Sequence, residues 1–340
     1  MSNEENDKMP EQQPRQPQNL QGLMRFAIEA NTLGEDTTCN NNLQPMDAER
    51  RAFLEKTLKS LTIDVIEVLQ TCIHTLHELC DSQDLTEHNE KKCKDALETI
   101  QDYVDNLDTA NDFFKIGGFK ILPICLSSSW PSIRSHGCEL IGDLAQNNPY
   151  CQENLLKCNV LEELFKLLLD EELVAVKAMY AISCMIRNYD PALEHLLTKG
   201  GFNNIVQVIG SKCTNDKLRT KGAFLLRALC LQDSRVRSEL VKLDTVEYLS
   251  SALSVANESR EHIMSALLSI ICSLESNNTN QEHINLDAIG EEAISRARKA
   301  DLNLKGTLDN FVKDCQNKPE VQEVFEYASK MQELIFKSET

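Results

Sequence analysis

The chain has 340 residues, of which 41% are hydrophobic and 5% aromatic, with only 12 Gly and 9 Pro. This length and apolar fraction allow a sizeable core and exclude a wholly disordered chain, and the scarcity of Gly and Pro favours helices. The 53 acidic and 35 basic residues give a net charge of −18, which opposes binding to nucleic acid or to an anionic membrane. The same charge either maintains solubility or steers the protein toward a basic partner.

The 13 cysteines form neither a zinc-site pattern nor a disulfide framework. Cys138, Cys184, Cys230 and Cys272 lie in apolar helical runs, where a free thiol packs as a small hydrophobe. The odd number of cysteines and the absence of C-x-x-C favour a reducing compartment. The polar N-terminus lacks the apolar core of a signal peptide, and no apolar run is long enough to span a membrane. We therefore expect a cytosolic protein, with or without a nuclear fraction.

In chain order, we divide the sequence into four segments. Residues 1–45 are polar and are expected to be mostly disordered, apart from a short amphipathic helix over 19–31. Residues 46–93 predict N-terminal capping helices that end in a polar linker at 81–93. Internal repeats occupy residues 94–275, and residues 276–340 predict a helical cap on the C-terminal end of the repeats.

The repeats are recognised by four tetrads that each end one apolar helical run and begin the next. They are Ile116-Gly117-Gly118-Phe119, Cys158-Asn159-Val160-Leu161, Lys199-Gly200-Gly201-Phe202 and Leu243-Asp244-Thr245-Val246. A period of about forty residues is typical of stacked helical units of the armadillo and HEAT kind. We therefore predict an all-α fold, an armadillo-like right-handed superhelix (α-solenoid) whose curved surface is open to a partner.

Each repeat also contains a central apolar run followed by a polar turn. Small residues recur at equivalent places in these runs, at Ala96, Gly137, Ala178 and Gly222. We expect neighbouring helices to approach closely there, because a small side chain leaves room for a facing helix. Pro149 and Pro191 follow two of the polar turns and prevent the preceding helix from continuing.

Polar residues recur at equivalent positions as well. Shifts of 41 and 44 residues align His136 with Lys177 and Lys221, Gln146 with Arg187, and Asn106 with Asn147 and Asn188. If the last helix of each repeat lines the concave surface, these side chains form a ladder across a groove. The alternative is that the asparagines cap helices and the cations are ordinary solvated charges. We expect capping for the asparagines and partner contact for Lys177, Arg187 and Lys221.

The sequence lacks the motifs of common enzyme classes. It contains no G-x-G-x-x-G, no phosphate-binding G-x-x-x-x-G-K-[ST], no H-E-x-x-H and no G-x-S-x-G. The seven histidines are scattered. We therefore predict that the protein is not an enzyme and has no catalytic, cofactor-binding or metal-binding residues.

Several segments resemble the Hsp-70-binding family of armadillo-type nucleotide-exchange factors, in its cytosolic branch. They occur in family order between residue 19 and about residue 275: Asn19-Leu20-Gln21-Gly22-Leu23, Pro45-Met46-Asp47-Ala48-Glu49-Arg50-Arg51, Asn106-Leu107-Asp108-Thr109-Ala110-Asn111-Asp112-Phe113, Leu140-Ile141-Gly142, Lys177-Ala178-Met179-Tyr180-Ala181-Ile182-Ser183-Cys184 and Lys221-Gly222-Ala223-Phe224-Leu225-Leu226. By this resemblance, Ala110 and Lys221 fall where the family contacts its chaperone.

The resemblance implies a co-chaperone that acts as a nucleotide-exchange factor for the cytosolic 70-kDa heat-shock chaperone. Such a protein would bind the chaperone's nucleotide-binding domain through its concave face, promote ADP release and so promote substrate release. We expect it to act as a monomer. The predicted partner-binding residues are Asn106, Ala110, Asn111, Gln146, Asn147, Lys177, Arg187, Asn188 and Lys221.

An alternative function is that of an armadillo-repeat adaptor, which would bind extended peptides or other protein partners. The grooves of such adaptors commonly repeat Trp and Asn along their last helices. This chain has a single tryptophan, Trp130, in a Ser-Trp-Pro context that suggests a loop. The tryptophan content therefore favours the exchange factor over the adaptor.

Overall fold

The computed structural model describes residues 63–80, 86–210, 215–274, 284–315 and 321–336, together with Ala48, Ala52, Phe53 and Thr57. The chain divides into two compact units, Met1–Val68 and Leu69–Thr340, and most of the described residues belong to the second. The helix expected over 19–31 and the disorder expected over 1–45 lie outside the described residues. Helix α3 begins just before the second unit.

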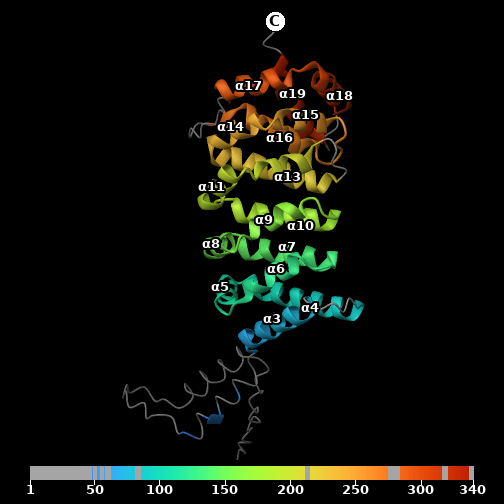
Figure 1. The fold of residues 1–340 in the computed structure, drawn as a ribbon. Coiled ribbons are helices and arrows are strands. Elements are labelled where there is room, and N and C mark those ends of the chain that lie inside the picture. Colours follow the sequence, from blue (N-terminus) through green and yellow to red (C-terminus); the bar gives the residue numbers. More distant parts are fainter. Residues whose placement is uncertain are drawn as a thin grey trace, which may run out of the picture. The chain divides into compact units, whose positions relative to one another are not determined.

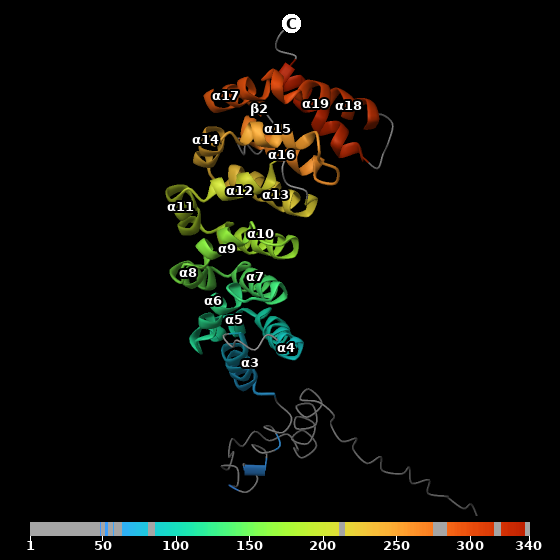
Figure 2. The same ribbon diagram turned by 45° about the vertical axis from the view of Figure 1, so that its right-hand side comes forward.

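Helix α3 (Val65–Cys80) and helix α4 (Glu87–Val104) are followed by five groups of three helices (Figure 1, Figure 2). The groups are α5 (Leu107–Lys115), α6 (Ile121–Leu126) and α7 (Pro131–Ala145); α8 (Pro149–Lys157), α9 (Val160–Leu167) and α10 (Glu172–Ile186); α11 (Asp190–Lys199), α12 (Phe202–Ile209) and α13 (Asp216–Gln232); α14 (Ser234–Lys242), α15 (Thr245–Leu253) and α16 (Arg260–Ile271); and α17 (Ala288–Ala297), α18 (Leu304–Cys315) and α19 (Gln322–Phe336). Two 3-10 helices, η1 (Gly118–Lys120) and η2 (Ala300–Leu302), and one antiparallel pair, β1 (Ser273–Leu274) with β2 (Ile284–Asn285), complete the described elements.

The third helix of each group packs on the third helix of the next group. The series runs from α7 through α10, α13 and α16 to α19, and α4 packs on α7 at its start. We call the exposed side of α4, α7, α10, α13 and α16 the long-helix face. This regular stacking, in which each group contacts its sequence neighbours, is the arrangement of an α-solenoid.

The second residue of every tetrad has a left-handed backbone conformation. These residues are Gly117 (φ 87°), Asn159 (φ 56°), Gly200 (φ 72°) and Asp244 (φ 55°). Gly, Asn and Asp are the residue types that tolerate this region, so each can end one helix and redirect the chain into the next. The apolar residue that closes each tetrad is buried, as the period predicts: Phe119, Leu161, Phe202 and Val246.

The small residues of the central runs lie where helices approach closely, which confirms the expectation from the sequence. A Cβ atom on Gly222 of α13 would lie 2.4 Å from Cγ2 of Ile209 in α12. A Cβ atom on Gly137 of α7 would lie 3.0 Å from Cβ of Cys125 in α6. The proline interpretation is also confirmed, because Pro149 is the first residue of α8 and Pro191 the second residue of α11.

One boundary differs from the expected one, and the predicted C-terminal helical cap is a further three-helix group. The linker predicted at 81–93 is wrong in its second half, since α4 begins at Glu87, where Thr86 accepts a hydrogen bond from the Asn89 amide and caps the helix. In the C-terminal segment, α17 to α19 repeat the three-helix plan, and Asn303 (φ 45°) provides the same left-handed joint. The sequence hid this group because Asp244 and Asn303 are much further apart than the other joints.

Buried polar side chains close the C-terminal ends of two long helices. Gln152 of α8 donates from Nε2 to the Cys184 carbonyl of α10 at 2.8 Å. Arg237 of α14, which is 3% exposed, donates to the Ile270 and Ile271 carbonyls of α16 at 3.0 and 3.1 Å. These contacts satisfy carbonyls that have no partner within their own helix.

Arg237 also forms an ion pair with Asp287, the residue that caps helix α17. Its Nη1 and Nη2 lie 2.8 and 3.0 Å from the two carboxylate oxygens, and Asp287 accepts a hydrogen bond from the Gly290 amide at 2.8 Å. Arg237 therefore joins the fourth three-helix group to the fifth.

We expect Arg237→Met to lower the free energy of unfolding by about 3 kcal/mol, because it leaves a carboxylate and two helix-end carbonyls without their donor. Urea unfolding followed by circular dichroism measures this. The matched control is Arg235→Met, on the same helix but 59% exposed, which should change little. Equal losses in both variants would contradict the role given to Arg237.

A second bidentate ion pair joins α7 to the loop between α9 and α10. Arg134 donates from Nε and Nη2 to the two oxygens of Asp170 at 2.6 and 2.7 Å, and both side chains are 16% exposed. The hydrogen bond from Arg134 lowers the pKa of Asp170 below its ordinary value of 3.8. Paired carboxylates of this kind make folding sensitive to acid.

The sign of the acid sensitivity follows from the lowered pKa of Asp170. Since the folded state favours the ionised carboxylate, this pair stabilises the fold fully above the unfolded-state pKa of 3.8 and is lost as the pH falls through the lower, folded-state value. We expect the stability difference between the wild type and Asp170→Asn to narrow below about pH 3.8. Urea midpoints across pH measure it. The exposed neighbour variant Glu171→Gln should keep the wild-type acid dependence, and an unchanged Asp170→Asn difference would contradict the assignment.

Candidate partner-binding groove

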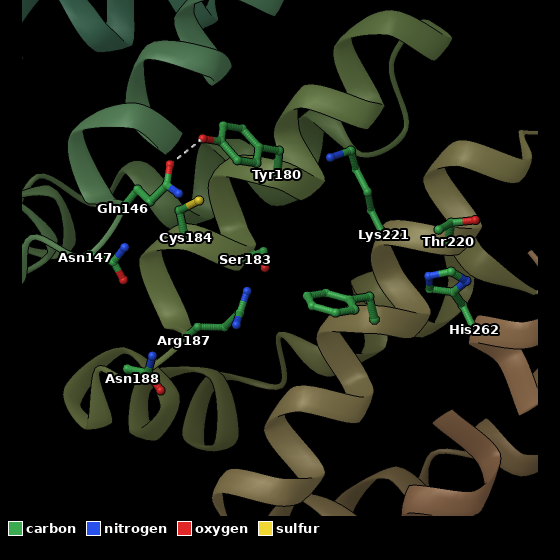
Figure 3. A pocket seen from close by; sticks show the side chains of 11 residues that line it. Gln146, Asn147, Tyr180, Ser183, Cys184, Arg187, Asn188, Thr220, Lys221 and His262 are labelled. Carbon is green, nitrogen blue, oxygen red and sulfur yellow. Dashed lines mark hydrogen bonds between the residues drawn. The ribbon is translucent and has the colours of Figure 1, made fainter. Parts of the chain in front are cut away.

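A groove of about 440 Å³ lies on the long-helix face, between α10 and α13 (Figure 3). The end of α7 and the start of α16 complete its walls. Its lining combines amide, hydroxyl, cationic and aromatic side chains, and consists of Gln146, Asn147, Tyr180, Ser183, Cys184, Arg187, Asn188, Thr220, Lys221, Phe224 and His262. Five of the nine residues predicted to contact a partner are brought together here, namely Gln146, Asn147, Arg187, Asn188 and Lys221.

The two cations of the groove each lie against an aromatic ring. The Lys221 Nζ is 5.2 Å from the centre of the Tyr180 ring, and the Arg187 Cζ is 5.2 Å from the centre of the Phe224 ring. Such cation–π contacts contribute about 0.5–1 kcal/mol at exposed sites. They hold the cations in place without neutralising their charge.

Tyr180 is itself held by contacts at the end of α7. Its hydroxyl donates to Asp143 Oδ1 at 3.0 Å and lies 3.1 Å from Gln146 Oε1 (Figure 3). The second oxygen of Asp143 accepts from Gln101 at 3.1 Å, and burial raises the pKa of the Asp143 carboxyl and of the Tyr180 hydroxyl. The absent side chain of Gly142 leaves room for the ring, since a Cβ atom there would lie 2.3 Å from Cε1 of Tyr180.

The three aligned positions His136, Lys177 and Lys221 are not equivalent in the structure. Lys177 lies outside the groove and forms an ion pair with Glu139 on α7. His136 lies 3.6 Å from Glu98 on α4. Lys177 therefore does not line the groove with Arg187 and Lys221, and a carboxylate of the preceding long helix faces it.

Of the three aligned asparagines, only Asn106 is a helix cap. Its Oδ1 accepts from the Asp108 and Thr109 amides at 3.0 and 3.1 Å, which confirms capping of α5. Capping is wrong for Asn147 and Asn188, which have left-handed φ angles of 54° and 57°. The residues that follow them, Asn148 and Tyr189, occupy the N-cap positions of α8 and α11.

The three asparagines have different roles because the turns that contain them differ in length. The turn between α4 and α5 is one residue shorter than the turns after α7 and α10, so a fixed shift of 41 residues pairs a cap with a turn residue. Asn147 and Asn188 are free to expose their side chains to the groove.

Ala110 and Asn111 lie away from the groove, on α5. Ala110 is 1% exposed and borders a second cavity of about 270 Å³, which it shares with Gln146 and Asn147. Asn111 accepts a hydrogen bond on Oδ1 from Nδ2 of Asn148 at 3.1 Å and thereby holds the cap of α8. The contact of Ala110 with a partner stays a prediction, and the structure adds that this side chain is buried within its own fold.

We expect Ala110→Arg to destabilise the protein by about 3 kcal/mol or more, because it forces a long cation into a packed site. The urea unfolding midpoint measures this. Leu107→Arg, on the same helix at 55% exposure, is the control and should unfold near the wild type. Wild-type stability of Ala110→Arg would show that the site can open.

Other kinds of site find no support in the described part of the chain. No group of three or more His, Cys, Asp or Glu side chains there could hold a metal ion. None of the helices within the described ranges is long and apolar enough to cross a membrane.

Two models of known protein families match this chain. The model for the SIL1/FES1/HPBP1 C-terminal domain matches residues 109–251, and the model for the nucleotide exchange factor Fes1 matches residues 20–113. The chain belongs to the SIL1/FES1/HPBP1 family. The two matches overlap on α5 and together include every residue that lines the groove except His262, which follows the end of the second match.

Individual relatives agree with this family assignment. Hsp70-binding protein 1 of Mus musculus is 26% identical over 339 residues, covering 96% of this chain and 88% of that protein. The Hsp70 nucleotide exchange factor FES1 of Saccharomyces cerevisiae is 27% identical over 187 residues, covering 53% of this chain and 64% of that protein. The SIL1/FES1/HPBP1 relationship thus extends through the three-helix groups.

Solved structures confirm the fold. A designed armadillo repeat protein, solved in complex with peptide (KR)4, has a TM-score of 0.56 and 15% identity, covering 76% of this chain and 98% of that chain. An engineered protein has a TM-score of 0.57 and 17% identity, covering 81% and 97%. The prediction of an all-α, armadillo-like solenoid for this member of the SIL1/FES1/HPBP1 family is therefore confirmed.

Proposed function

We propose that this chain is a co-chaperone that acts as a nucleotide-exchange factor for the cytosolic 70-kDa heat-shock chaperone. It binds the chaperone's nucleotide-binding domain through the long-helix face and promotes release of ADP, and hence of substrate. The observation that carries the proposal is the relation to Hsp70-binding protein 1, which extends over 96% of the chain. The groove supports it, since it offers an open polar and aromatic surface on that face.

The exchange activity follows from differential binding. A factor releases ADP only if it binds the open, nucleotide-poor state of the chaperone more tightly than the closed state. Equal affinity for the two states would leave the nucleotide in place. The long-helix face fits this role because successive long helices pack directly on each other, so it presents one continuous surface to a lobe of the nucleotide-binding domain.

The proposal includes the way the protein operates. It works as a monomer, without a cofactor and without catalysis of its own, and it uses neither nucleic acid nor a membrane as partner. Its net charge of −18 supports the last two points, because it opposes contact with phosphate backbones and anionic head groups. We place it in the cytosol, where its chaperone partner resides.

The test is ADP release from the full-length cytosolic 70-kDa heat-shock chaperone loaded with fluorescent ADP. We expect the protein to accelerate release and to weaken ADP affinity by roughly 5- to 150-fold, the usual range of coupling between sites. Stopped-flow fluorescence and equilibrium titration measure the two quantities. An unrelated armadillo protein is the control, and release at the intrinsic rate at saturating concentration would refute exchange.

A pull-down from cytosol distinguishes this function from that of an adaptor. Recovery of the 70-kDa chaperone in nucleotide-sensitive form supports the exchange factor. Recovery of partners that bind through extended peptides, with no chaperone, would instead support the adaptor.

A further inference from the structure

We propose that the groove is a receptor for the carboxylate side chains of an acidic segment on the chaperone's nucleotide-binding domain. Lys221 and Arg187 bind the carboxylates, and the Tyr180 and Phe224 rings position the two cations. The identity of the partner rests on the proposed function. The preference for carboxylates rests on the groove alone.

The residue type changes along the long helices at one recurring position. Glu98 on α4, Glu139 on α7 and Tyr180 on α10 are successive residues 41 apart, and each faces the cation position of the next long helix. The two glutamates lie close to His136 and Lys177. At the third step tyrosine takes the place of the carboxylate, so the Lys221 ammonium lies against a ring.

The second cation of the groove also lies against a ring. Phe224 on α13 is the residue that follows Tyr180 in this series, but its exposed ring lies beneath the guanidinium of Arg187, at the end of the preceding long helix α10. Within the described ranges, no carboxylate forms an ion pair with Arg187 or Lys221, whereas Lys177 has one from Glu139.

Asp143 is the carboxylate that could most nearly compete with a partner for Lys221, but both of its oxygens already accept other hydrogen bonds. Its oxygens accept from Gln101 and from the Tyr180 hydroxyl, so it fixes the ring on which Lys221 rests. Asp143 thus acts behind the groove wall, and Lys221 projects over the ring into the groove (Figure 3).

The groove favours protein carboxylates over other anions. The amides of Gln146, Asn147 and Asn188 add neutral hydrogen-bonding groups around the cations, and the two rings add apolar surface. A volume of about 440 Å³ accepts a few side chains of a protein segment. Aspartate and glutamate match this combination, because their carboxylates are carried on short apolar stems that can pack against the rings.

The experiment titrates the protein with the isolated nucleotide-binding domain of the chaperone at several salt concentrations. We expect Lys221→Gln and Arg187→Gln each to weaken binding about tenfold or more and to flatten its salt dependence. Lys177→Gln is the matched control, being the equivalent lysine with an internal partner, and should stay within about twofold. Thermal unfolding of each variant checks the fold.

The aromatic residues are tested as positioning residues. Tyr180→Leu should weaken binding as Lys221→Gln does and should add little when the two are combined, because both act through the same cation. Tyr180→Phe keeps the ring and should retain most of the affinity. Additive losses would assign Tyr180 a contact of its own.

A second probe separates this inference from the proposed function. Poly-L-glutamate should bind the wild type and compete with the nucleotide-binding domain, poly-L-lysine should not, and Lys221→Gln should lose the binding of poly-L-glutamate. If ADP release is accelerated equally by the wild type and by Lys221→Gln and Arg187→Gln, the exchange function stands and the carboxylate receptor is refuted. If the nucleotide-binding domain does not bind but poly-L-glutamate does, the receptor stands and the exchange function fails.

Discussion

The structure depends on the packing of each long third helix between two others. Helix α10 packs on α7 on one side and on α13 on the other, and its inward residues Ala178, Ile182 and Ile186 have no exposed surface. No three-helix group can bury its apolar surface alone, so stability comes from neighbours. Buried side chains such as Arg237, which reaches both α16 and the cap of α17, join the groups at points where helix ends would otherwise leave carbonyls without donors.

The same packing explains where a partner can bind. Stacking covers the apolar sides of the long helices and leaves their remaining side chains on one continuous face. Elsewhere on this face, some charges are matched within the protein, as with Lys177 and Glu139. The groove between α10 and α13 differs because Lys221 and Arg187 lie against aromatic rings, and Tyr180 stands beside Lys221 where the preceding repeats have a glutamate. Binding capacity therefore arises where the repeat departs from its own pattern.

Part of the fold could be predicted because it depends on local chemistry. The four tetrads place Gly, Asn or Asp where the backbone must be left-handed, and Pro149 begins a helix as its missing amide hydrogen allows. These signals lie within a few residues of their effect. The C-terminal three-helix group was less visible, because its joint at Asn303 does not keep the spacing of the others.

By itself, the sequence determined the repeat, the all-α solenoid, the family and five of the residues that line the groove. Only the tertiary structure decided how equivalent residues differ. Alignment makes Lys177 and Lys221 the same, but the partner of each comes from the preceding long helix, where one position is Glu139 and the other Tyr180. Likewise, one residue of turn length separates the cap Asn106 from the turn residue Asn147, and only the structure shows that the side chain of Ala110 is buried. A side chain's availability depends on what faces it across the packing, and no period in the sequence records that.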